Sequence, residues 1–140
     1  MIIRRATYEQ AKSIKAFDVF IGDRRVDNTR GELFIALEGD ELLGYIAYSS
    51  DYFFNKPFIR LLCVKETAQR KGVADALVKT VLNVYTGLEV WTSTEEWNEP
   101  AIKLFQKLGF IKTGALSGLN TDNANEVFFV LPLPTGTSAG

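Results

Sequence analysis

Histidine is absent from this chain of 140 residues, and cysteine occurs once, as Cys63. Without histidine the chain lacks the most common general base and metal ligand, and no Ser-His-Asp or Cys-His catalytic arrangement can be built from it. A single cysteine cannot form an internal disulfide or supply a structural zinc site. We therefore expect no bound metal and a reducing compartment.

Long apolar runs and an excess of one charge are missing as well. No run approaches the roughly 20 residues of a membrane span, and the N-terminus lacks the apolar core of a signal peptide. Sixteen Lys and Arg residues oppose 17 Asp and Glu residues, so the net charge of −1 gives no general attraction to nucleic acid or anionic lipid. The nucleotide-binding patterns GxGxxG and GxxxxGK[ST] are absent too. We expect a cytoplasmic protein without nucleic-acid or membrane partners.

The composition is that of an ordinary globular domain. Hydrophobic residues make up 46% and charged residues 24% of the chain, which is long enough for one domain with one core. We expect the folded domain to cover residues 1–133. Residues 134–140 are rich in Pro, Thr, Gly and Ser, which predicts a flexible C-terminal tail.

The spacing of apolar residues predicts an α/β fold. The expected strands are residues 2–5, 33–37, 42–49, 58–64, 88–93, 110–113 and 126–131, and the expected helices are residues 8–17, 73–85 and 98–108. Thr7 alone is expected to cap the first helix. Residues 18–31 are interpreted as a loop or short helix, and residues 51–56 as a connection.

The order of these elements constrains the sheet. A helix links strands 58–64 and 88–93, which requires a parallel pair joined by a right-handed crossover. The other neighbours are joined by short turns and should be antiparallel. The expected architecture is a mixed, mostly antiparallel sheet with helices on both faces, in which strand 126–131 is a candidate edge.

A short basic segment centred on glycine, Gln69-Arg70-Lys71-Gly72-Val73-Ala74, joins an apolar strand to the helix predicted at 73–85. The first N–H groups of a helix lack intrahelical acceptors, and the helix dipole there is equivalent to roughly half a positive charge. Gly72 has no Cβ to hold a ligand away, and Arg70 and Lys71 add positive charge. The segment therefore suits a diphosphate. The alternative is an exposed loop with two solvated cations.

This segment and a second block resemble the GNAT (Gcn5-related N-acetyltransferase) family. Gln69, Gly72 and Ala74 occupy the defining positions of that family's acetyl-CoA loop, Gln/Arg-x-x-Gly-x-Gly/Ala. Residues 98–110, NEPAIKLFQKLGF, are similar to its N-x-x-A-x-x-L-Y-x-x-x-G-F helix and the strand that follows. The resemblance covers residues 1–133 and implies the single-domain GNAT fold, with a splayed parallel pair of strands and acetyl-CoA as cosubstrate.

The resemblance also implies which residues contact the cofactor. These are Leu62, Cys63, Val64, Gln69, Arg70, Lys71, Gly72, Val73, Ala74, Asn98 and Phe105. Two of these groups have structural alternatives, because residues 62–64 also fit a plain buried strand and Asn98 also fits a helix N-cap. Cys63 as a covalent nucleophile is the minor interpretation, since only Lys65 stands nearby in sequence to lower its pKa.

Two expected catalytic groups are replaced. Where many GNAT members carry a glutamate base and a tyrosine acid, the resemblance places Arg60 and Phe105. A thiolate with a pKa near 8.5 leaves without help from an acid, so the missing base is the larger loss. Tyr48, Asp51, Tyr52, Glu95 and Glu96 remain as substitutes for the base, and the catalytic candidates kept are Tyr48, Glu96 and Asn98.

The implied function is transfer of acetyl from acetyl-CoA to a primary amine of a small molecule or peptide by direct attack. An α-amine, with a pKa near 7.7–8.0, needs a base less than a lysine does. Arg24, Arg25 and Arg30 are either solvated loop cations or a site for a carboxylate or phosphate of the acceptor. The alternative function is a non-catalytic acyl-CoA-binding regulatory or interaction module, and a homodimer is left open.

Overall fold

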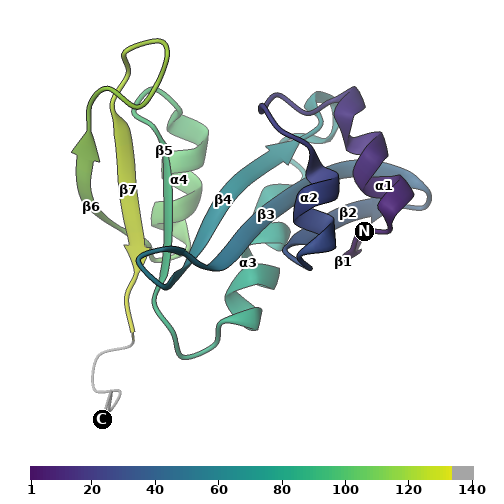
Figure 1. Cartoon of the computed structure of the whole chain (residues 1–140), viewed down its shortest axis with the longest axis horizontal. Coiled ribbons are helices and arrows are strands. Elements are labelled where there is room, and N and C mark those ends of the chain that lie inside the picture. The colour runs from purple at the N-terminus through teal and green to yellow at the C-terminus, as the bar shows by residue number, and fades with distance from the viewer. Residues whose placement is uncertain (134–140) are drawn as a thin grey trace. The chain divides into compact units, whose positions relative to one another are not determined.

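Within residues 1–133, which the computed structural model describes, seven strands form one mixed sheet (Figure 1). The strand order is β1-β2-β3-β4-β5-β7-β6, with β4 and β5 as the parallel pair. The strands are β1 Ile2–Arg5, β2 Leu33–Glu38, β3 Glu41–Phe53, β4 Lys56–Val64, β5 Val90–Glu95, β6 Ile111–Leu116 and β7 Glu126–Leu131. The helices are α1 Tyr8–Ser13, η1 Ile14–Ala16, α2 Arg24–Thr29, η2 Glu66–Ala68, α3 Val73–Val84 and α4 Glu99–Lys107. The expected mixed sheet is confirmed. The tail expected at 134–140 lies outside the described residues.

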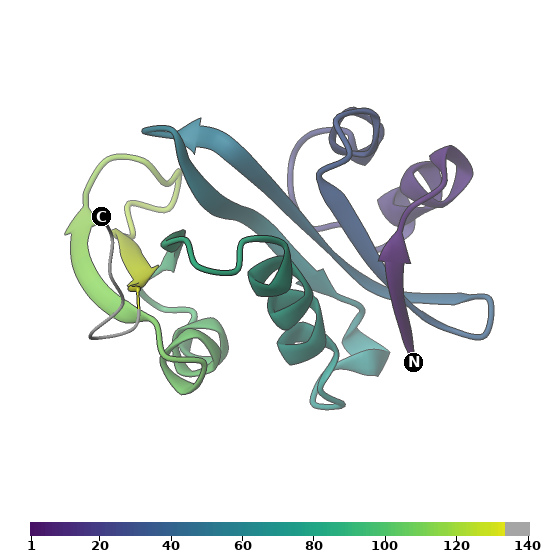
Figure 2. The same cartoon turned by 90° about the horizontal axis from the view of Figure 1, so that it is seen from below.

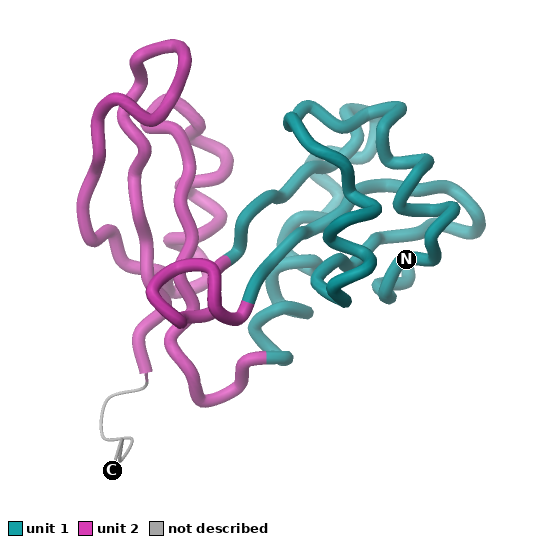
Figure 3. The backbone as a smooth tube through the Cα atoms, viewed as in Figure 1, with its two compact units in different colours: residues 1–49, 59–84 teal, residues 50–58, 85–140 magenta. Residues whose placement is uncertain are grey.

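Backbone contacts divide the chain into two compact units (Figure 3). Unit 1 comprises residues 1–49 and 59–84. Unit 2 comprises residues 50–58 and, within the described chain, residues 85–133. No helix of the described residues is both long enough and apolar enough to cross a membrane.

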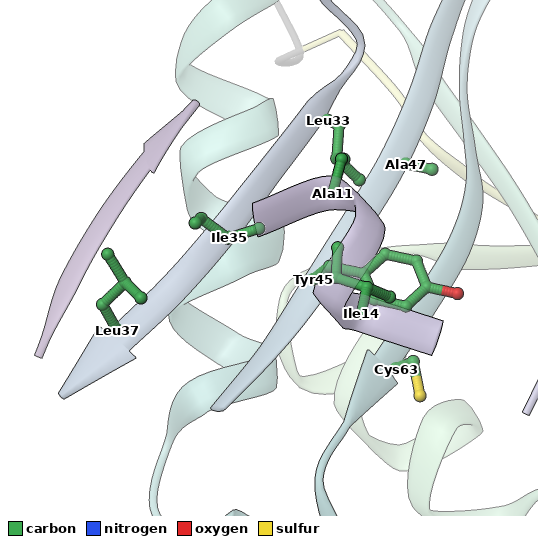
Figure 4. Close-up of a cluster of buried hydrophobic side chains, with 8 residues drawn as sticks. All are labelled: Ala11, Ile14, Leu33, Ile35, Leu37, Tyr45, Ala47 and Cys63. Carbon is green, nitrogen blue, oxygen red and sulfur yellow. The ribbon is translucent and has the colours of Figure 1, made fainter. Parts of the chain in front are cut away.

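Unit 1 carries helices on both faces of its strands. The register of β1, β2 and β3 is antiparallel, and α1 and α2 cover one face while α3 lies against β1 and β2 on the other (Figures 1 and 2). Alternate residues of the strands face α1, and a cluster of buried side chains fills the space between them (Figure 4). Its members are Ala11, Ile14, Leu33, Ile35, Leu37, Tyr45, Ala47 and Cys63.

The first helix is shorter than expected and better capped. The Thr7 hydroxyl accepts a hydrogen bond from the Gln10 backbone N–H (3.2 Å), and the Gln10 side chain accepts one from the Thr7 N–H (2.9 Å). This reciprocal capping box shows that the cap does not depend on Thr7 alone. The chain then tightens into η1, and α2 occupies part of the segment expected to be a loop or short helix.

Gly44 lies where β3 passes close to the end of β4. A Cβ at Gly44 would stand 2.6 Å from the Cys63 carbonyl oxygen and 3.1 Å from the Val64 Cα, both backbone atoms that cannot move aside cheaply. The Lys65 N–H donates to the Leu43 carbonyl at 2.7 Å and closes the same contact. The absence of a side chain at Gly44 therefore allows β3 to pack closely against the end of β4, the strand that leads into the basic segment at residues 69–74.

We expect Gly44→Ala to lower the free energy of unfolding by about 1–3 kcal/mol, because the methyl group overpacks a backbone contact. Gly114→Ala is the matched control, since Gly114 also lies in a strand but has no atom within 4 Å of its ideal Cβ position. Chemical denaturation of both variants tests this. Equal effects of the two substitutions would contradict the close approach at Gly44.

Unit 2 corrects two expectations. The segment expected to be a connection is a tight hairpin, because β3 continues to Phe53 and β4 begins at Lys56. Its two turn residues, Phe54 and Asn55, have positive φ angles of 52° and 59°, as in the two-residue turns that match strand twist. The candidate edge strand was also wrong: β7 pairs with both β5 and β6, so β6 lies at the edge.

Candidate functional site

The last residues of β4 lead into the candidate site, which lies in unit 1. Cys63 is buried with the core cluster beneath α1, and its thiol donates a long hydrogen bond to the Phe17 carbonyl at 3.8 Å. Burial raises the pKa of the Cys63 thiol. A buried thiol whose pKa is raised is a poor nucleophile, so the geometry favours a structural role for this side chain.

A short bridge ties the basic segment to the end of β4. The strand ends at Val64, and η2 follows, of which the last residue, Ala68, is buried. The Gln69 side-chain amide donates back to the Val64 carbonyl at 3.3 Å. Val64 and Gln69 are both expected to contact the cofactor, and they are hydrogen-bonded to each other.

The basic segment itself has an unusual backbone. Arg70 has a φ angle of +65° and Gly72 one of +78°, so two left-handed residues alternate with Lys71 between them. For a residue with a Cβ this conformation costs about 1 kcal/mol or more. In known anion-binding turns, left-handed residues that alternate with right-handed ones direct successive N–H groups toward one side, and the positive φ angles at Arg70 and Gly72 match the left-handed positions of such a turn. Strain of this kind is concentrated at functional sites.

Helix α3 begins directly after this turn. The Ala76 N–H donates to the Gly72 carbonyl at 3.1 Å, so Gly72 takes the N-cap position without a capping side chain. The N–H groups that precede Ala76 in α3 therefore come before the first i→i−4 hydrogen bond of the helix. Val73 is buried, and Leu77 is buried one turn later, which fixes the helix start in place.

Charge around the turn is positive. Arg70 and Lys71 are both exposed, whereas the carboxylate of Asp75 pairs with Lys79 at 2.9 Å. A Cβ at Gly72 would meet no atom within 4 Å, so glycine is required here for its backbone conformation and for open space above the amides. The turn can hold a group with two negative charges through backbone donors.

Arg60, which stands at the position expected for a glutamate base, belongs to a buried chain of charges. Its Nη1 contacts Asp27 Oδ1 at 2.5 Å, and the other oxygen of Asp27 contacts Arg24 Nη1 at 2.8 Å. Arg24 Nε lies 3.2 Å from Asp18 Oδ2, and the Tyr45 hydroxyl donates to Asp18 Oδ1 at 2.5 Å. Burial, and then the hydrogen bond to Asp18, raise the pKa of Tyr45.

The three arginines Arg24, Arg25 and Arg30, which share one interpretation from the sequence, have different surroundings in the structure. Arg24 is buried, so a solvated role is wrong for it. Arg25 lies near the surface and pairs with Asp23, and that contact lowers the pKa of Asp23 to about 2. Arg30 is exposed. The spacing of Arg24 and Asp27 at i and i+3 was the one local signal for the buried pair.

Tyr48, a catalytic candidate in unit 1, is hydrogen-bonded to Arg5 and to the backbone of Gly31. Its hydroxyl accepts a hydrogen bond from Arg5 Nη1 at 2.8 Å and donates one to the Gly31 carbonyl at 3.1 Å. Burial raises the pKa of Tyr48 even though Arg5 lowers it in part. Its role in proton transfer stays a prediction.

The other candidates lie in unit 2. Asn98 is the N-cap of α4, with its side-chain oxygen accepting from the Ala101 N–H at 3.4 Å, so the capping interpretation holds. Glu96 is exposed, and its carboxylate accepts from the Asn125 N–H at 3.2 Å. Phe105 is buried, and its ring lies 5.4 Å from that of Phe110 between centroids. Cofactor contacts of Asn98 and Phe105 stay predictions.

Comparison with known proteins agrees with this geometry. An archaeal N-alpha-acetyltransferase from Saccharolobus solfataricus is 28% identical over 114 residues, which span 71% of this chain and 68% of that protein. N-alpha-acetyltransferase 30 from Xenopus laevis is 33% identical over 87 residues, which span 56% of this chain and only 31% of that protein.

The solved structures show the same fold. The yncA acetyltransferase of Salmonella typhimurium, determined with its cofactor acetyl-CoA, superposes with a TM-score of 0.78 over 100% of this chain and 98% of its own, at 16% identity. The profile of the Acetyltransferase (GNAT) family matches residues 2–110. The match begins in β1 and ends just after α4, so it includes the basic turn and both left-handed residues. The chain therefore belongs to the GNAT family of acetyltransferases.

Proposed function

We propose that this chain transfers the acetyl group of acetyl-CoA to the α-amine of a peptide or small-molecule acceptor. The proposal rests on one observation above all, the left-handed turn at Arg70 and Gly72 that leads directly into the N-terminus of α3. That turn suits the diphosphate of the donor, because backbone N–H groups and the helix dipole both favour doubly charged anions. The acetyl-CoA found with the Salmonella relative supports the same donor.

The remaining donor contacts follow from the position of β4. Because Gln69 is bonded to the Val64 carbonyl, the diphosphate turn and the strand end form one connected piece of unit 1. In this proposal the backbone of residues 62–64 pairs with the pantetheine arm.

The acceptor class follows from proton chemistry. In direct attack the amine nitrogen bonds to the thioester carbon, the C–S bond breaks, the CoA thiolate leaves, and the nitrogen gives up a proton. At pH 7.5 about a third of α-amines but only about one in a thousand lysine side chains are already neutral. With Arg60 paired to Asp27 where a base is usual, an acceptor that needs little deprotonation is favoured. The N-alpha-acetyltransferase names of the matched relatives support this acceptor.

The test is an acceptor comparison that follows release of the CoA thiol. One peptide carries a free α-amine and no lysine, and its partner carries a blocked α-amine and one lysine. We expect turnover with the first, rising with pH through the α-amine pKa near 8 and levelling off about one pH unit above it, and far slower turnover with the second. Equal rates for the two peptides would contradict an α-amine acceptor.

The second candidate function is a non-catalytic acyl-CoA-binding module. It is favoured by the ion pair that neutralises Arg60 and by the burial of Phe105, since neither side chain then replaces the expected base or acid. Binding of CoA without thiol release on any amine would support this function. Turnover with any acceptor would exclude it.

Direct attack predicts that Cys63→Ala keeps acetyl transfer. Cys63 is buried and its raised pKa keeps the thiol protonated, so the side chain contributes packing and no covalent intermediate. We expect kcat to stay within about threefold of the parent, with a small loss of stability from the missing sulfur. Loss of turnover in a folded variant, together with acetylated Cys63 in the parent detected by mass spectrometry, would instead establish a two-step mechanism.

A further inference from the structure

A small pocket in unit 1 lies between α1 and the turn that enters α2. Its volume is about 220 Å³. It is lined by Ala11, Lys12, Lys15, Asp18, Gly22, Asp23, Arg24 and Arg25. None of these residues belongs to the diphosphate turn or to β4, so the pocket shares no lining residue with the donor contacts proposed above.

The carboxylates of this pocket are already occupied by partners within the protein. Both oxygens of Asp23 accept from Arg25, at 2.9 Å and 2.5 Å. Asp18 accepts from the Tyr45 hydroxyl and from the Phe20 N–H, and its second oxygen faces Arg24. Both carboxylates are therefore engaged by these partners, and Asp23 in addition interacts only at longer range with the charge of Lys15.

Two positive charges of the lining, both on lysines, have no ion-pair partner among the described residues. Arg25 balances Asp23, and Arg24 together with Arg60 balances Asp18 and Asp27. Lys12 and Lys15, which are exposed and lie at i and i+3 along α1 and η1, make no ion pair within the part of the chain that the structure describes. The pocket thus carries a net charge of about +2 from its own lining.

Arg24 contributes a fixed positive charge to the lining. Arg24 is 5% exposed, and its Nε has no hydrogen bond, although it lies 3.2 Å from Asp18 Oδ2. A hydrogen bond from Nη2 to the Ile21 carbonyl at 2.9 Å also fixes the position of the guanidinium. A Cβ at Gly22 would stand 2.4 Å from that same nitrogen, and the φ angle of Gly22 is +113°, so a residue with a side chain is strained at this position of the lining.

We propose that this pocket binds a small dianion, either a phosphate group or a dicarboxylate. The two flexible ammonium groups of Lys12 and Lys15 supply charge-assisted donors for such an ion, and the fixed Arg24 guanidinium adds positive charge to the lining. The volume lies below that of pockets for drug-sized ligands, which limits the ligand to a few heavy atoms. A dianion bound here stabilises the packing of α1 on the α2 turn, because the unfolded chain has no such pocket.

The experiment is a titration of the full chain followed by amide NMR in the presence of saturating CoA, which keeps the diphosphate turn filled. Inorganic phosphate and succinate are titrated separately. We expect saturable shifts of the amides of Lys12, Lys15 and residues 22–25. A response to phosphate alone assigns a phosphate ligand, and a response to succinate alone assigns a dicarboxylate. No saturable shift of these amides with either probe would overturn the proposal.

A double variant gives the matched test. Lys12→Gln with Lys15→Gln is expected to weaken binding of the responding probe roughly tenfold, whereas Lys103→Gln with Lys112→Gln, at two exposed lysines of unit 2, leaves it unchanged. Equal binding by both double variants would overturn the site. If CoA itself does not bind, the donor proposal fails, but the titration without CoA still reports on this pocket through the same amides.

Discussion

Gly72→Asp is expected to abolish CoA binding, weakening it by about 100-fold or more in a calorimetric titration. The substitution places a carboxylate beside the amides that are proposed to hold the diphosphate, so like charges meet where the donor must sit. It also gives a Cβ to a residue whose φ angle is +78°. The electrostatic and steric effects act in the same direction.

Two control variants separate these effects. Gly39→Asp makes the same chemical change in the same unit, at a glycine with a φ angle of +60° and no atom within 4 Å of its ideal Cβ, and should leave CoA binding intact. Gly72→Ala keeps the backbone strain without the charge and should fall between the parent and Gly72→Asp. If Gly72→Asp binds CoA as tightly as the parent, the diphosphate lies elsewhere.

The second large effect concerns stability. Asp27→Asn should lower the free energy of unfolding by about 3 kcal/mol, because it removes the negative charge shared by Arg24 and Arg60 and leaves buried positive charge unbalanced. The side chains of Asp27 and Arg24 are only 5% and 4% exposed, whereas that of Arg60 is 27% exposed, which places the effect at the lower end of the usual range for buried pairs. Urea denaturation measures it.

Asp23→Asn is the matched control for this substitution. Asp23 also pairs with an arginine, but both side chains are more than 40% exposed, and asparagine keeps the N-cap that Asp23 provides to α2. Its expected cost is below about 1 kcal/mol. Similar losses for the two variants would show that the buried chain of charges contributes no more than a surface ion pair.

The sequence predicted those parts of the molecule that depend on local chemistry. The strand before the basic segment, the glycine turn and the start of α3 at Val73 all follow from short-range rules of strand pattern, φ preference and helix ends. The left-handed Arg70 did not follow, because a residue with a Cβ gives no such signal. The same reason hid the Phe54-Asn55 hairpin, whose turn contains no glycine.

Features that depend on tertiary packing could not be predicted from the sequence. Alternating apolar residues identified the strand at Glu126–Leu131 but contain no information on which strands lie beside it, so its central place between β5 and β6 was missed. The pairing of Arg60 with Asp27 joins residues 33 positions apart in the chain. Only the fold shows that this cation is balanced internally.

The double use of Asp27 has an evolutionary consequence. One carboxylate neutralises cations contributed by α2 and by β4, so a substitution at this position alone leaves Asp18 as the one remaining carboxylate of this ion-pair network against two arginines. Neutral replacements at the three positions should therefore arise together along a lineage or not at all. Among homologous sequences, we expect position 27 to covary with position 60 as well as with its near neighbour at position 24, a correlation that sequence counting alone can detect.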